Sequence, residues 1–271
     1  MKTVSDPAQV GAQMRARRDR GETIGFVPTM GFLHDGHLSL MKQAREVCDH
    51  LVVSIYVNPL QFGPTEDLDR YPSDPEGDAA KCAAVGVDTL FTPPDLYDAD
   101  HSTTVRVSGL TGGLCGASRP GHFDGVTTVV ARLFGIVQPT LAVFGEKDYQ
   151  QLAVIRRMVR DLCMGIEIVG GPLIRDHDGL ALSSRNKYLD ESNRRRALTL
   201  HRALNTMAQA TTPSAAERLA LGRAVIEADS VDYLEIVDPE SLEPVEQIEG
   251  PVRALVAAWI GNTRLIDNIG F

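Results

Sequence analysis

Two histidines three residues apart are the side chains of this sequence best suited to chemistry. His34 and His37 belong to the segment HDGH, and their spacing places both rings on the same side of a helix start. An imidazole can donate a hydrogen bond to a phosphate, move a proton or bind a metal ion. Histidines at this spacing also occur as simple helix caps or as solvated side chains. The sequence around them is therefore needed to choose between a functional and a structural role.

The segment around the two histidines predicts a strand, a turn and a helix. Residues 23–27 are apolar, Pro28 interrupts that run, and apolar residues recur at helical spacing further on. The turn at 31–37 would lie at a helix N-terminus, where backbone N–H groups attract anions and Gly31 and Gly36 allow a close approach. The glycine spacing imitates a Walker P-loop, but histidine and leucine follow where that motif needs lysine and serine or threonine.

A second junction of the same type follows the apolar strand predicted at 141–144. Gly145 ends that strand, and Glu146, Lys147 and Asp148 then open a predicted helix. We expect Lys147 to meet a phosphate, because two phosphate-compatible junctions in one parallel sheet favour a shared ligand. The alternative is an ordinary ion pair between Lys147 and a neighbouring carboxylate.

Two glutamines follow predicted strands closely. Gln61 lies in the loop after the second strand, and Gln151 lies about one turn into the helix after residues 141–144. Their amides offer donors and acceptors suited to hydroxyl or carboxylate groups, and the two could share one ligand. Gln61 could instead only stabilise its turn. The polar segment 67–75 is either a mobile cover over the site or a surface loop.

A third polar segment, IRDHDGLALSSR at 174–185, is too polar for a core and resembles a flap. Arg185 can place two donors on phosphate oxygens, and Ser183 and Ser184 add hydroxyl donors. Either serine could also cap a helix predicted at 186–207, and capping is compatible with ligand contact.

The remaining periodicity alternates between helix and strand. Helices are expected at 6–20, 76–85, 126–137 and 150–162, and strands at 51–57 and 89–91. This alternation predicts an α/β fold with a Rossmann-like parallel sheet, right-handed crossovers and ligands at the carboxyl ends of the strands. The sequence is strongly helical at 190–227 and favours strands at 232–237 and 252–259, which indicates a smaller second α/β domain.

Composition limits the classes of function. The chain has 271 residues and a net charge of −9, which disfavours nucleic acid or an anionic membrane as the main partner. The four cysteines are far apart without a CxxC pair, so we expect reduced thiols rather than a zinc site or disulfides. No signal-peptide or membrane-spanning pattern is present, and we expect a soluble, cytoplasmic protein.

Six segments together resemble one family. They are PTMGFLHDGH, YVNPLQFGPTEDLDRYP, RPGHFDGVTTVV, FGEKDYQQL, DGLALSSRN and TRLIDNI. The chain resembles the pantothenate synthetases, which are ATP-dependent pantoate:β-alanine ligases of the HxGH nucleotidyltransferase superfamily. One departure is Leu182, where relatives commonly have methionine, and a backbone contact there should survive the change.

The resemblance implies an architecture and a reaction. Residues 1–175 would form a Rossmann-like domain that binds nucleotide and pantoate, and residues 176–271 a smaller α/β domain that closes over the active site, in a homodimer. The carboxylate of (R)-pantoate would displace pyrophosphate from ATP, and the amine of β-alanine would then displace AMP. A carboxylate is ionised at neutral pH and needs no general base, so the enzyme must mainly align reactants and neutralise phosphate charge.

The resemblance also assigns residues. His37, His34, Lys147 and Arg185 would be catalytic, with His37 as the proton donor, while Gln61 and Gln151 would bind pantoate and Gln61 would adjoin β-alanine. Arg119 is a further candidate. Mg²⁺ would be carried on the phosphates with few or no protein ligands. The residues implied to bind ATP are Met30, Gly31, Phe32, Leu33, His34, Asp35, Gly36, His37, Gly145, Glu146, Lys147, Asp148, Ile174, Leu182, Ser183, Ser184 and Arg185.

Three other functions stay open at this point. A zinc hydrolase could use His34 and His37, but a third ligand at sensible spacing and the glutamate of HExxH are missing. A non-catalytic nucleotide sensor would bind ATP without releasing pyrophosphate. The nearest alternative is another HxGH-type adenylating ligase that acts on a different small carboxylic acid.

Overall fold

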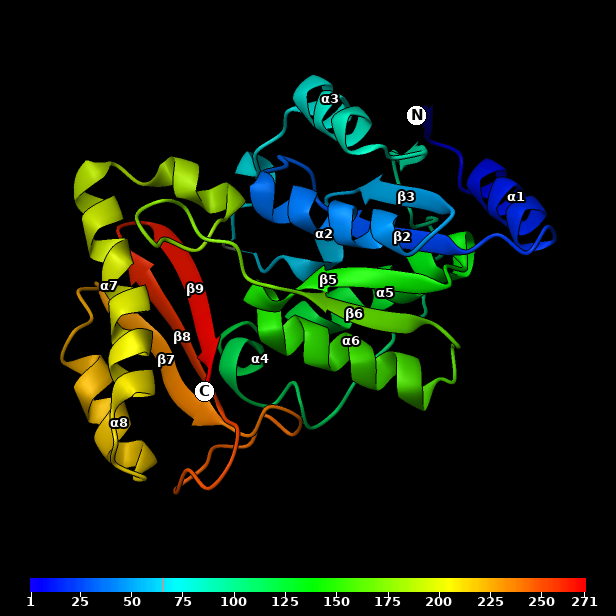
Figure 1. Cartoon of the computed structure of the whole chain (residues 1–271). Coiled ribbons are helices and arrows are strands. Elements are labelled where there is room, and N and C mark those ends of the chain that lie inside the picture. The colour runs from blue at the N-terminus through cyan, green and yellow to red at the C-terminus, as the bar shows by residue number, and fades with distance from the viewer. Residues whose placement is uncertain (65) are drawn as a thin grey trace. The chain divides into compact units, whose positions relative to one another are not determined.

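The computed structural model describes residues 1–64 and 66–271, so Thr65 of the YVNPLQFGPTEDLDRYP segment lies outside the described residues. The chain divides into two compact units (Figure 1). The first unit contains Met1–Ser108, Arg119–Glu146 and Gln151–Pro172. The second contains Gly109–Ser118, Lys147–Gln150 and Leu173–Phe271.

The first unit alternates strands with helices. Its elements are β1 (Lys2–Val4), α1 (Pro7–Arg18), β2 (Ile24–Thr29), α2 (Asp35–Glu46), β3 (His50–Ile55), η1 (Pro59–Gln61), η2 (Leu68–Arg70), α3 (Pro75–Val85), β4 (Thr89–Phe91), α5 (His122–Val137), β5 (Leu141–Gly145) and β6 (Glu167–Gly171). Two elements cross between the units, η3 (Glu146–Asp148) and α6 (Tyr149–Asp161). The predicted strand–helix alternation is confirmed.

All strands of the first unit pair in parallel, in the order β1-β4-β3-β2-β5-β6. From β2 the chain moves outward to β3 and β4 on one side, and it later returns to β5 and β6 on the other side. The strand order therefore reverses between β2 and β5. In open parallel sheets this reversal leaves a crevice outside the carboxyl ends of the two strands, where ligands bind.

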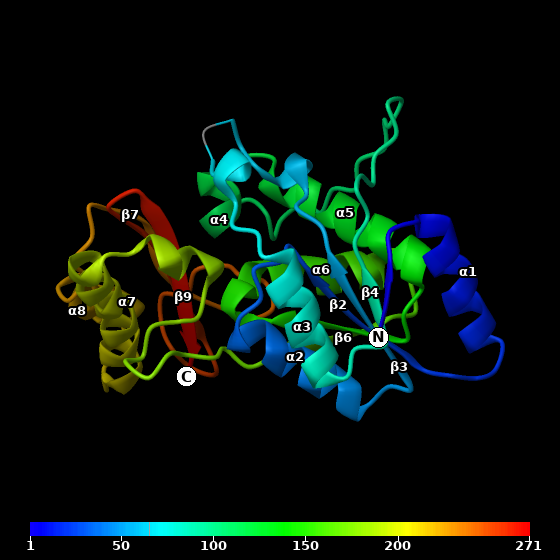
Figure 2. The same cartoon turned by 90° about the horizontal axis from the view of Figure 1, so that it is seen from above.

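Each face of this sheet is covered by helices, as the continuous apolar strands require. Val27 of β2 packs with Met41 of α2 and Cys82 of α3. The next residue back along β2, Phe26, points to the opposite face, where its ring lies 6.3 Å from that of Phe134 in α5. Figure 2 shows α2 and α3 on one side of the strands and α5 on the other. Strand β2 is therefore packed between helices on both faces of the sheet.

Strand β2 extends through Pro28 to Thr29, two residues beyond the predicted end. The Thr29 carbonyl accepts from Tyr56 N on the β3 side, so Pro28, one residue earlier, faces β5. The pairing of β2 with β5 already ends at Phe26. The missing N–H of Pro28 therefore removes no ladder hydrogen bond, and proline is tolerated there.

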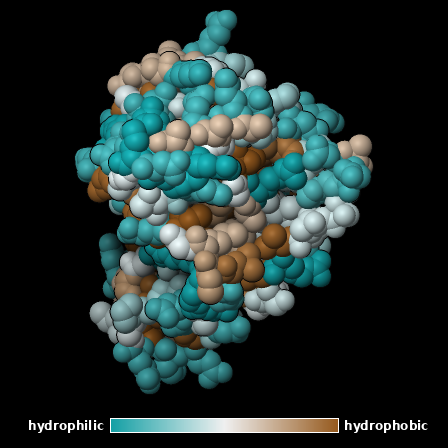
Figure 3. All heavy atoms as spheres, turned by 90° about the vertical axis from the view of Figure 1, so that its right-hand side faces the viewer, coloured by the Kyte–Doolittle hydropathy of each residue, from teal (hydrophilic) through white to brown (hydrophobic). Residues whose placement is uncertain are grey.

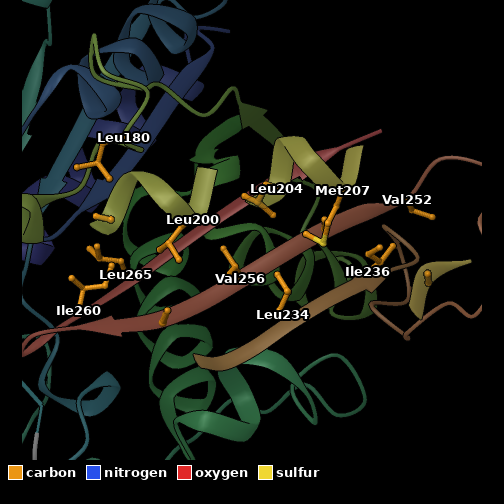
Figure 4. Close-up of a cluster of buried hydrophobic side chains, with 14 residues drawn as sticks. Leu180, Leu200, Leu204, Met207, Leu234, Ile236, Val252, Val256, Ile260 and Leu265 are labelled. Carbon is orange, nitrogen blue, oxygen red and sulfur yellow. The ribbon is translucent and has the colours of Figure 1, made fainter. Parts of the chain in front are cut away.

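The second unit packs helices on an antiparallel sheet of order β7-β8-β9. Leu200, Leu204 and Met207 of α7 form its core with strand residues such as Val256 and Leu234 (Figure 4). Its elements are α4 (Leu114–Ser118), η4 (Ser184–Tyr188), α7 (Glu191–Gln209), α8 (Ala215–Arg223), β7 (Ser230–Val237), β8 (Arg253–Ile260) and β9 (Thr263–Gly270).

The helix predicted at 186–207 begins later than expected. Residues 184–188 form the 3₁₀ helix η4, which Ser183 caps by accepting from Arg185 N. Helix α7 begins only at Glu191, where the Asp190 side chain accepts from Asn193 N at 2.7 Å. The aspartate is the stronger capping signal because it stands directly before the continuous helical pattern.

The surface drawn in Figure 3 is mostly hydrophilic, with hydrophobic residues in small areas between polar ones. Among the described residues, every helix is too short or too polar to cross a membrane.

Candidate active site

A strained turn follows β2 and leads to the two histidines. Gly31 and Phe32 have φ angles of 85° and 51°, in the left-handed region that residues with side chains rarely adopt. A Cβ at Gly31 would lie 3.0 Å from Ile55 Cγ2 and 3.1 Å from Asp78 Oδ2, so a larger residue would be crowded there as well as strained by the φ angle. Non-glycine strain of this type persists only where the surroundings enforce it.

The carboxylate of Asp78 enforces this turn. Asp78 belongs to α3 and is only 1% exposed. Its two oxygens accept from the backbone N–H groups of Phe32 and Leu33, each at 2.7 Å. Lys81, one turn further along α3, donates to the Leu33 carbonyl at 2.9 Å. The conformation of the turn is thus fixed by hydrogen bonds from a neighbouring helix.

The two histidines open α2 together. His34 is the N-cap residue, and its backbone N–H donates to Nδ1 of His37 at 3.3 Å. The two rings lie 4.1 Å apart. Because Nδ1 of His37 accepts a hydrogen bond, the neutral ring carries its proton on Nε2, where it is a donor. His37 therefore caps the helix and still offers an Nε2–H donor. Asp35 and Gly36 are the first two helical residues and stand between the two histidines in the sequence.

Gln61 lies beside Met30 in the first unit. Its Nε2 is 3.0 Å from the Met30 sulfur, a weak acceptor, and its Oε1 accepts from Asn58 Nδ2 at 3.2 Å. Asn58 is 1% exposed and also donates to the Gly125 carbonyl at 3.0 Å. Asn58 thus orients the Gln61 amide with its N–H₂ group toward the end of β2.

The main chain of Gln61 is held by two further side chains, those of His122 and Arg119. The ring Nδ1 of His122 lies 2.8 Å from the Gln61 carbonyl, and Arg119 donates to the same carbonyl at 3.3 Å. Arg119 also pairs with Glu66 through two hydrogen bonds of 2.7 and 2.6 Å. Burial alone would raise the pKa of Glu66, but the bonds from Arg119 hold that pKa below its ordinary value. Arg119 is therefore a support of Gln61.

Three further predicted residues of the first unit lie at or after the end of β5. Gly145 is its last residue and pairs with Gly171 of β6, and Glu146 opens η3. Gln151 lies in the first turn of α6. Because β5 pairs in parallel with β2, their carboxyl ends lie at the same edge of the sheet.

The other predicted residues belong to the second unit. The Lys147 ammonium lies 3.8 Å from the Asp148 carboxylate, and its side chain is 21% exposed. This contact is the ion pair considered as the alternative for Lys147, and at this distance in a partly solvated place it is weak.

Residues 174–182 form a short hairpin, and η4 begins two residues later. Leu182 N donates to the Ile174 carbonyl at 3.0 Å, and an antiparallel bridge joins Arg175 and Ala181. Ser183, Ser184 and Arg185 follow directly. Ile174 and Leu182 are thereby brought together, at the base of the segment that carries the hydroxyls and the guanidinium.

The described residues contain no group of three or more His, Cys, Asp or Glu side chains that could hold a metal ion.

Comparisons with known proteins decide the family. The family model for pantoate-beta-alanine ligase matches residues 2–270. This chain belongs to the pantoate-beta-alanine ligase family. The resemblance expected from the sequence motifs is confirmed, and with it the α/β fold class.

Several members of the pantoate-beta-alanine ligase family are similar over their whole length. The pantothenate synthetases of Moorella thermoacetica and Anaeromyxobacter dehalogenans are 51% and 53% identical, over 99% and 98% of this chain and 98% and 96% of theirs. A crystal structure of the enzyme from Thermus thermophilus is 49% identical with a TM-score of 0.94, covering 99% of both chains. The ligase of Francisella tularensis, crystallised with Beta-gamma ATP and Beta-alanine, is 33% identical with a TM-score of 0.83, covering 99% of this chain and 97% of that one.

Sequence reasoning missed the residues that support the turn and Gln61. Asp78 was visible only as one acidic residue of a predicted helix, and Asn58 only as part of a loop. A buried polar residue is hard to recognise in a sequence, although an aspartate among the apolar positions of an amphipathic helix is a usable signal.

Proposed function

We infer that this chain is an ATP-dependent ligase that condenses (R)-pantoate with β-alanine to give pantothenate, AMP and pyrophosphate through a pantoyl adenylate. Family membership supports the substrates. The observation that carries the assignment of the site is the turn after β2. It places His37 and the first N–H groups of α2 at the carboxyl end of β2, next to the point where the strand order of the parallel sheet reverses. This assignment replaces the zinc hydrolase and the nucleotide sensor as interpretations of the HDGH segment.

We propose the following roles for individual residues. His37 and His34 contact the phosphates of ATP, and Lys147 and Arg185 supply positive charge to them. Gln61 and Gln151 bind pantoate, and Gln61 also adjoins β-alanine. The wider set of ATP contacts in this proposal is Met30, Gly31, Phe32, Leu33, Asp35, Gly36, Gly145, Glu146, Asp148, Ile174, Leu182, Ser183 and Ser184. Residues 1–175 form the nucleotide- and pantoate-binding domain, and residues 176–271 the smaller domain.

In the first step a carboxylate oxygen of pantoate forms a bond to the α-phosphorus of ATP. The bond from that phosphorus to the bridging oxygen of the β-phosphate breaks, and pyrophosphate leaves with the electron pair. Negative charge builds on the phosphate oxygens, so donors fixed in advance lower the barrier. The Nε2–H of His37 and the ammonium of Lys147 are such donors, and the amide of Gln61 can hold the attacking acid in line.

In the second step the uncharged amine of β-alanine attacks the acyl carbon of the adenylate. The C–O bond to AMP breaks, AMP leaves with its electron pair, and the nitrogen loses a proton to solvent water. The Gln61 amide is already oriented by Asn58, so it can keep the acyl group in place between the two steps. Mg²⁺ would be carried on the triphosphate with few or no protein ligands, and it would serve the first step by neutralising phosphate charge and so improving pyrophosphate as a leaving group.

Release of pyrophosphate without the amine tests the two-step reaction. With ATP, Mg²⁺ and (R)-pantoate but no β-alanine, we expect roughly one pyrophosphate per active site and a retained acyl adenylate, because an enclosed site excludes water. An acid that lacks the hydroxyl groups of pantoate should give no such burst, which separates this ligase from one for another acid. Pyrophosphate that appears only after β-alanine is added would contradict a separate adenylate.

We also propose, from the resemblance to the family, that the enzyme is a cytoplasmic homodimer. Light scattering on purified protein should then give twice the chain mass of 29.4 kDa. A mass of one chain across the working concentration range would contradict the dimer.

A further inference from the structure

Strand β9 carries two neighbouring polar residues that are almost fully buried. Asp267 and Asn268 are 5% and 4% exposed. Successive residues of a strand point to opposite faces of a sheet, and Leu265, two residues before Asp267, belongs to the core beneath α7. Asp267 therefore lies on the α7 face and Asn268 on the opposite face. Buried polar groups are costly unless they are satisfied, so the partners of these two residues indicate their purpose.

On the α7 face, Asp267 holds the start of the 174–182 hairpin. The two terminal nitrogens of Arg175 donate to its two carboxylate oxygens at 2.7 and 2.9 Å. Arg175 also donates to the Gly179 carbonyl at 3.1 Å, inside the hairpin. A bidentate ion pair of this kind fixes the orientation of the guanidinium as well as its distance from the carboxylate. The hairpin leads directly into the segment that carries Arg185.

On the other face, Asn268 holds the main chain of Lys147. Its Nδ2 donates to the Lys147 carbonyl at 3.0 Å, while its Oδ1 accepts from Arg253 at 2.7 Å. The Arg253 guanidinium in turn lies 3.8 Å from the centroid of the Tyr149 ring, whose hydroxyl donates to the Pro239 carbonyl at 3.0 Å. A cation can only donate, so the Asn268 amide must turn its oxygen to Arg253 and its N–H₂ group to Lys147.

We propose that Asp267 and Asn268 are positioning residues for adenylation. One strand end anchors, on its two faces, the segments that carry Lys147 and Arg185, so the two cations keep a fixed separation without either anchor touching substrate. This role rests on the proposed phosphate contacts of Lys147 and Arg185. Misplacement of a catalytic group by about 1 Å can cost roughly 100-fold in rate, so the anchors matter to catalysis even though they are remote from the chemistry.

The substitution Asn268→Asp tests the anchor of Lys147. It keeps an acceptor for Arg253 and replaces the donor with a second oxygen, which repels the Lys147 carbonyl. We expect pyrophosphate release from ATP and pantoate to slow roughly 10- to 100-fold and KM for ATP to rise, with KM for pantoate nearly unchanged. Asn268→Ala, which only removes the donor, should change the same constants in the same direction and serves if the aspartate variant does not fold.

A double-mutant cycle separates positioning from general damage. In the Lys147→Ala background, Asn268→Asp should cause no further loss of adenylation, because the group that it positions is already absent. Effects that multiply would show that Asn268 does not act through Lys147. The control is Leu265→Ala in the same strand, which removes core packing and should lower the melting temperature without changing KM for ATP.

The companion variant Asp267→Asn removes the charge that holds Arg175. We expect a loss of adenylation below about tenfold, which disappears in the Arg185→Ala background. If Lys147→Ala and Arg185→Ala leave adenylation intact, the proposed site fails and the positioning role fails with it. If these two variants impair adenylation and neither β9 variant does, the site stands and the positioning role alone is refuted.

Discussion

Two regions of the molecule present donors suited to phosphate in different ways. In the first unit the donors are short: the first main-chain N–H groups of α2 and the His37 ring, behind a turn fixed by Asp78. In the second unit the donors are the long side chains of Lys147 and Arg185, and the segments that bear them are fixed by residues of β9.

The difference lies in what each region can control. Main-chain donors and a capping histidine have almost no rotamer freedom left to lose, so they can define the position of a phosphate accurately. Lysine and arginine supply full charge, but their side chains must become ordered when a ligand binds. The positions of their charged groups depend on where the segments that carry them are anchored. Both regions use a buried aspartate as the anchor, yet Asp78 holds backbone N–H groups whereas Asp267 holds a guanidinium.

The largest effects should come from removing one donor of each type. His37→Ala and Lys147→Ala should each slow adenylation by on the order of 10² to 10³, or about 3 to 4 kcal/mol of transition-state stabilisation. The second step should suffer less, because its leaving group is AMP rather than pyrophosphate. Pyrophosphate release measures the first step, and chemically prepared pantoyl adenylate given β-alanine measures the second. Equal losses in both steps would defeat the step-specific role of these donors.

The melting temperature then distinguishes the two regions. His37→Ala also removes the acceptor of the His34 N–H, so it should destabilise the protein by about 1 kcal/mol, whereas Lys147→Ala removes only a weak ion pair. His37→Gln is the matched control, since glutamine at this helix position restores a capping box without an imidazole. It should recover the melting temperature and leave adenylation slow. A glutamine variant with normal adenylation would reduce His37 to a cap.

Much of the first unit could be predicted from the sequence because its signals are local. The apolar strands, the helical spacing after the histidines and the polar junctions after residues 29 and 145 all lie within a few residues of the features they identify. The short strands β1 and β6, the helix α4 and the strand β9 were not predicted. The residues of these three strands pair through partners elsewhere in the chain rather than through a strong pattern of their own, and α4 is only five residues long.

The supports of the site could not be predicted for the same physical reason. Asp78 is 46 residues from Phe32 and 45 from Leu33, and Asn268 is 121 residues from Lys147. No periodicity connects residues so far apart, and one sequence alone does not show which polar side chains become buried. The motifs therefore predict which groups would act on phosphate, while the groups that hold them appear only in the folded chain.

A smaller effect should follow from weakening the anchor of the β2–α2 turn. In Asp78→Asn, one of the two backbone N–H groups of Phe32 and Leu33 would face an amide N–H₂ group instead of an oxygen. We expect a loss of about 1 to 3 kcal/mol of unfolding free energy and adenylation slower by roughly 10- to 100-fold. The control is Cys82→Ala, one turn further along α3, which removes buried packing and should leave adenylation per folded molecule unchanged. Equal rates in both variants would make Asp78 a purely structural residue.

The smallest effect concerns Glu66, the outermost support of Gln61. Burial acts to raise the pKa of this carboxyl, but the hydrogen bonds from Arg119 outweigh burial and hold the pKa below the ordinary value of 4.5. A lowered pKa means that the pair stabilises the folded state fully above pH 4.5 and loses that effect as the pH falls through the lowered pKa.

Glu66→Gln tests whether this support acts through charge, in contrast to the hydrogen-bonded anchor at Asp78. The two side chains of the pair are 17% and 23% exposed, so solvent screens their attraction, and we expect the variant to be less stable by about 1 kcal/mol at neutral pH. Denaturant titrations should show this difference to be constant down to about pH 5 and to shrink below pH 4.5, as the wild-type carboxylate becomes protonated. The exposed Glu240→Gln should show no such narrowing. The stability difference between wild type and Glu66→Gln could instead stay the same at about pH 4. Hydrogen-bond geometry rather than charge would then hold Arg119, and Glu66 would not differ in this respect from Asp78.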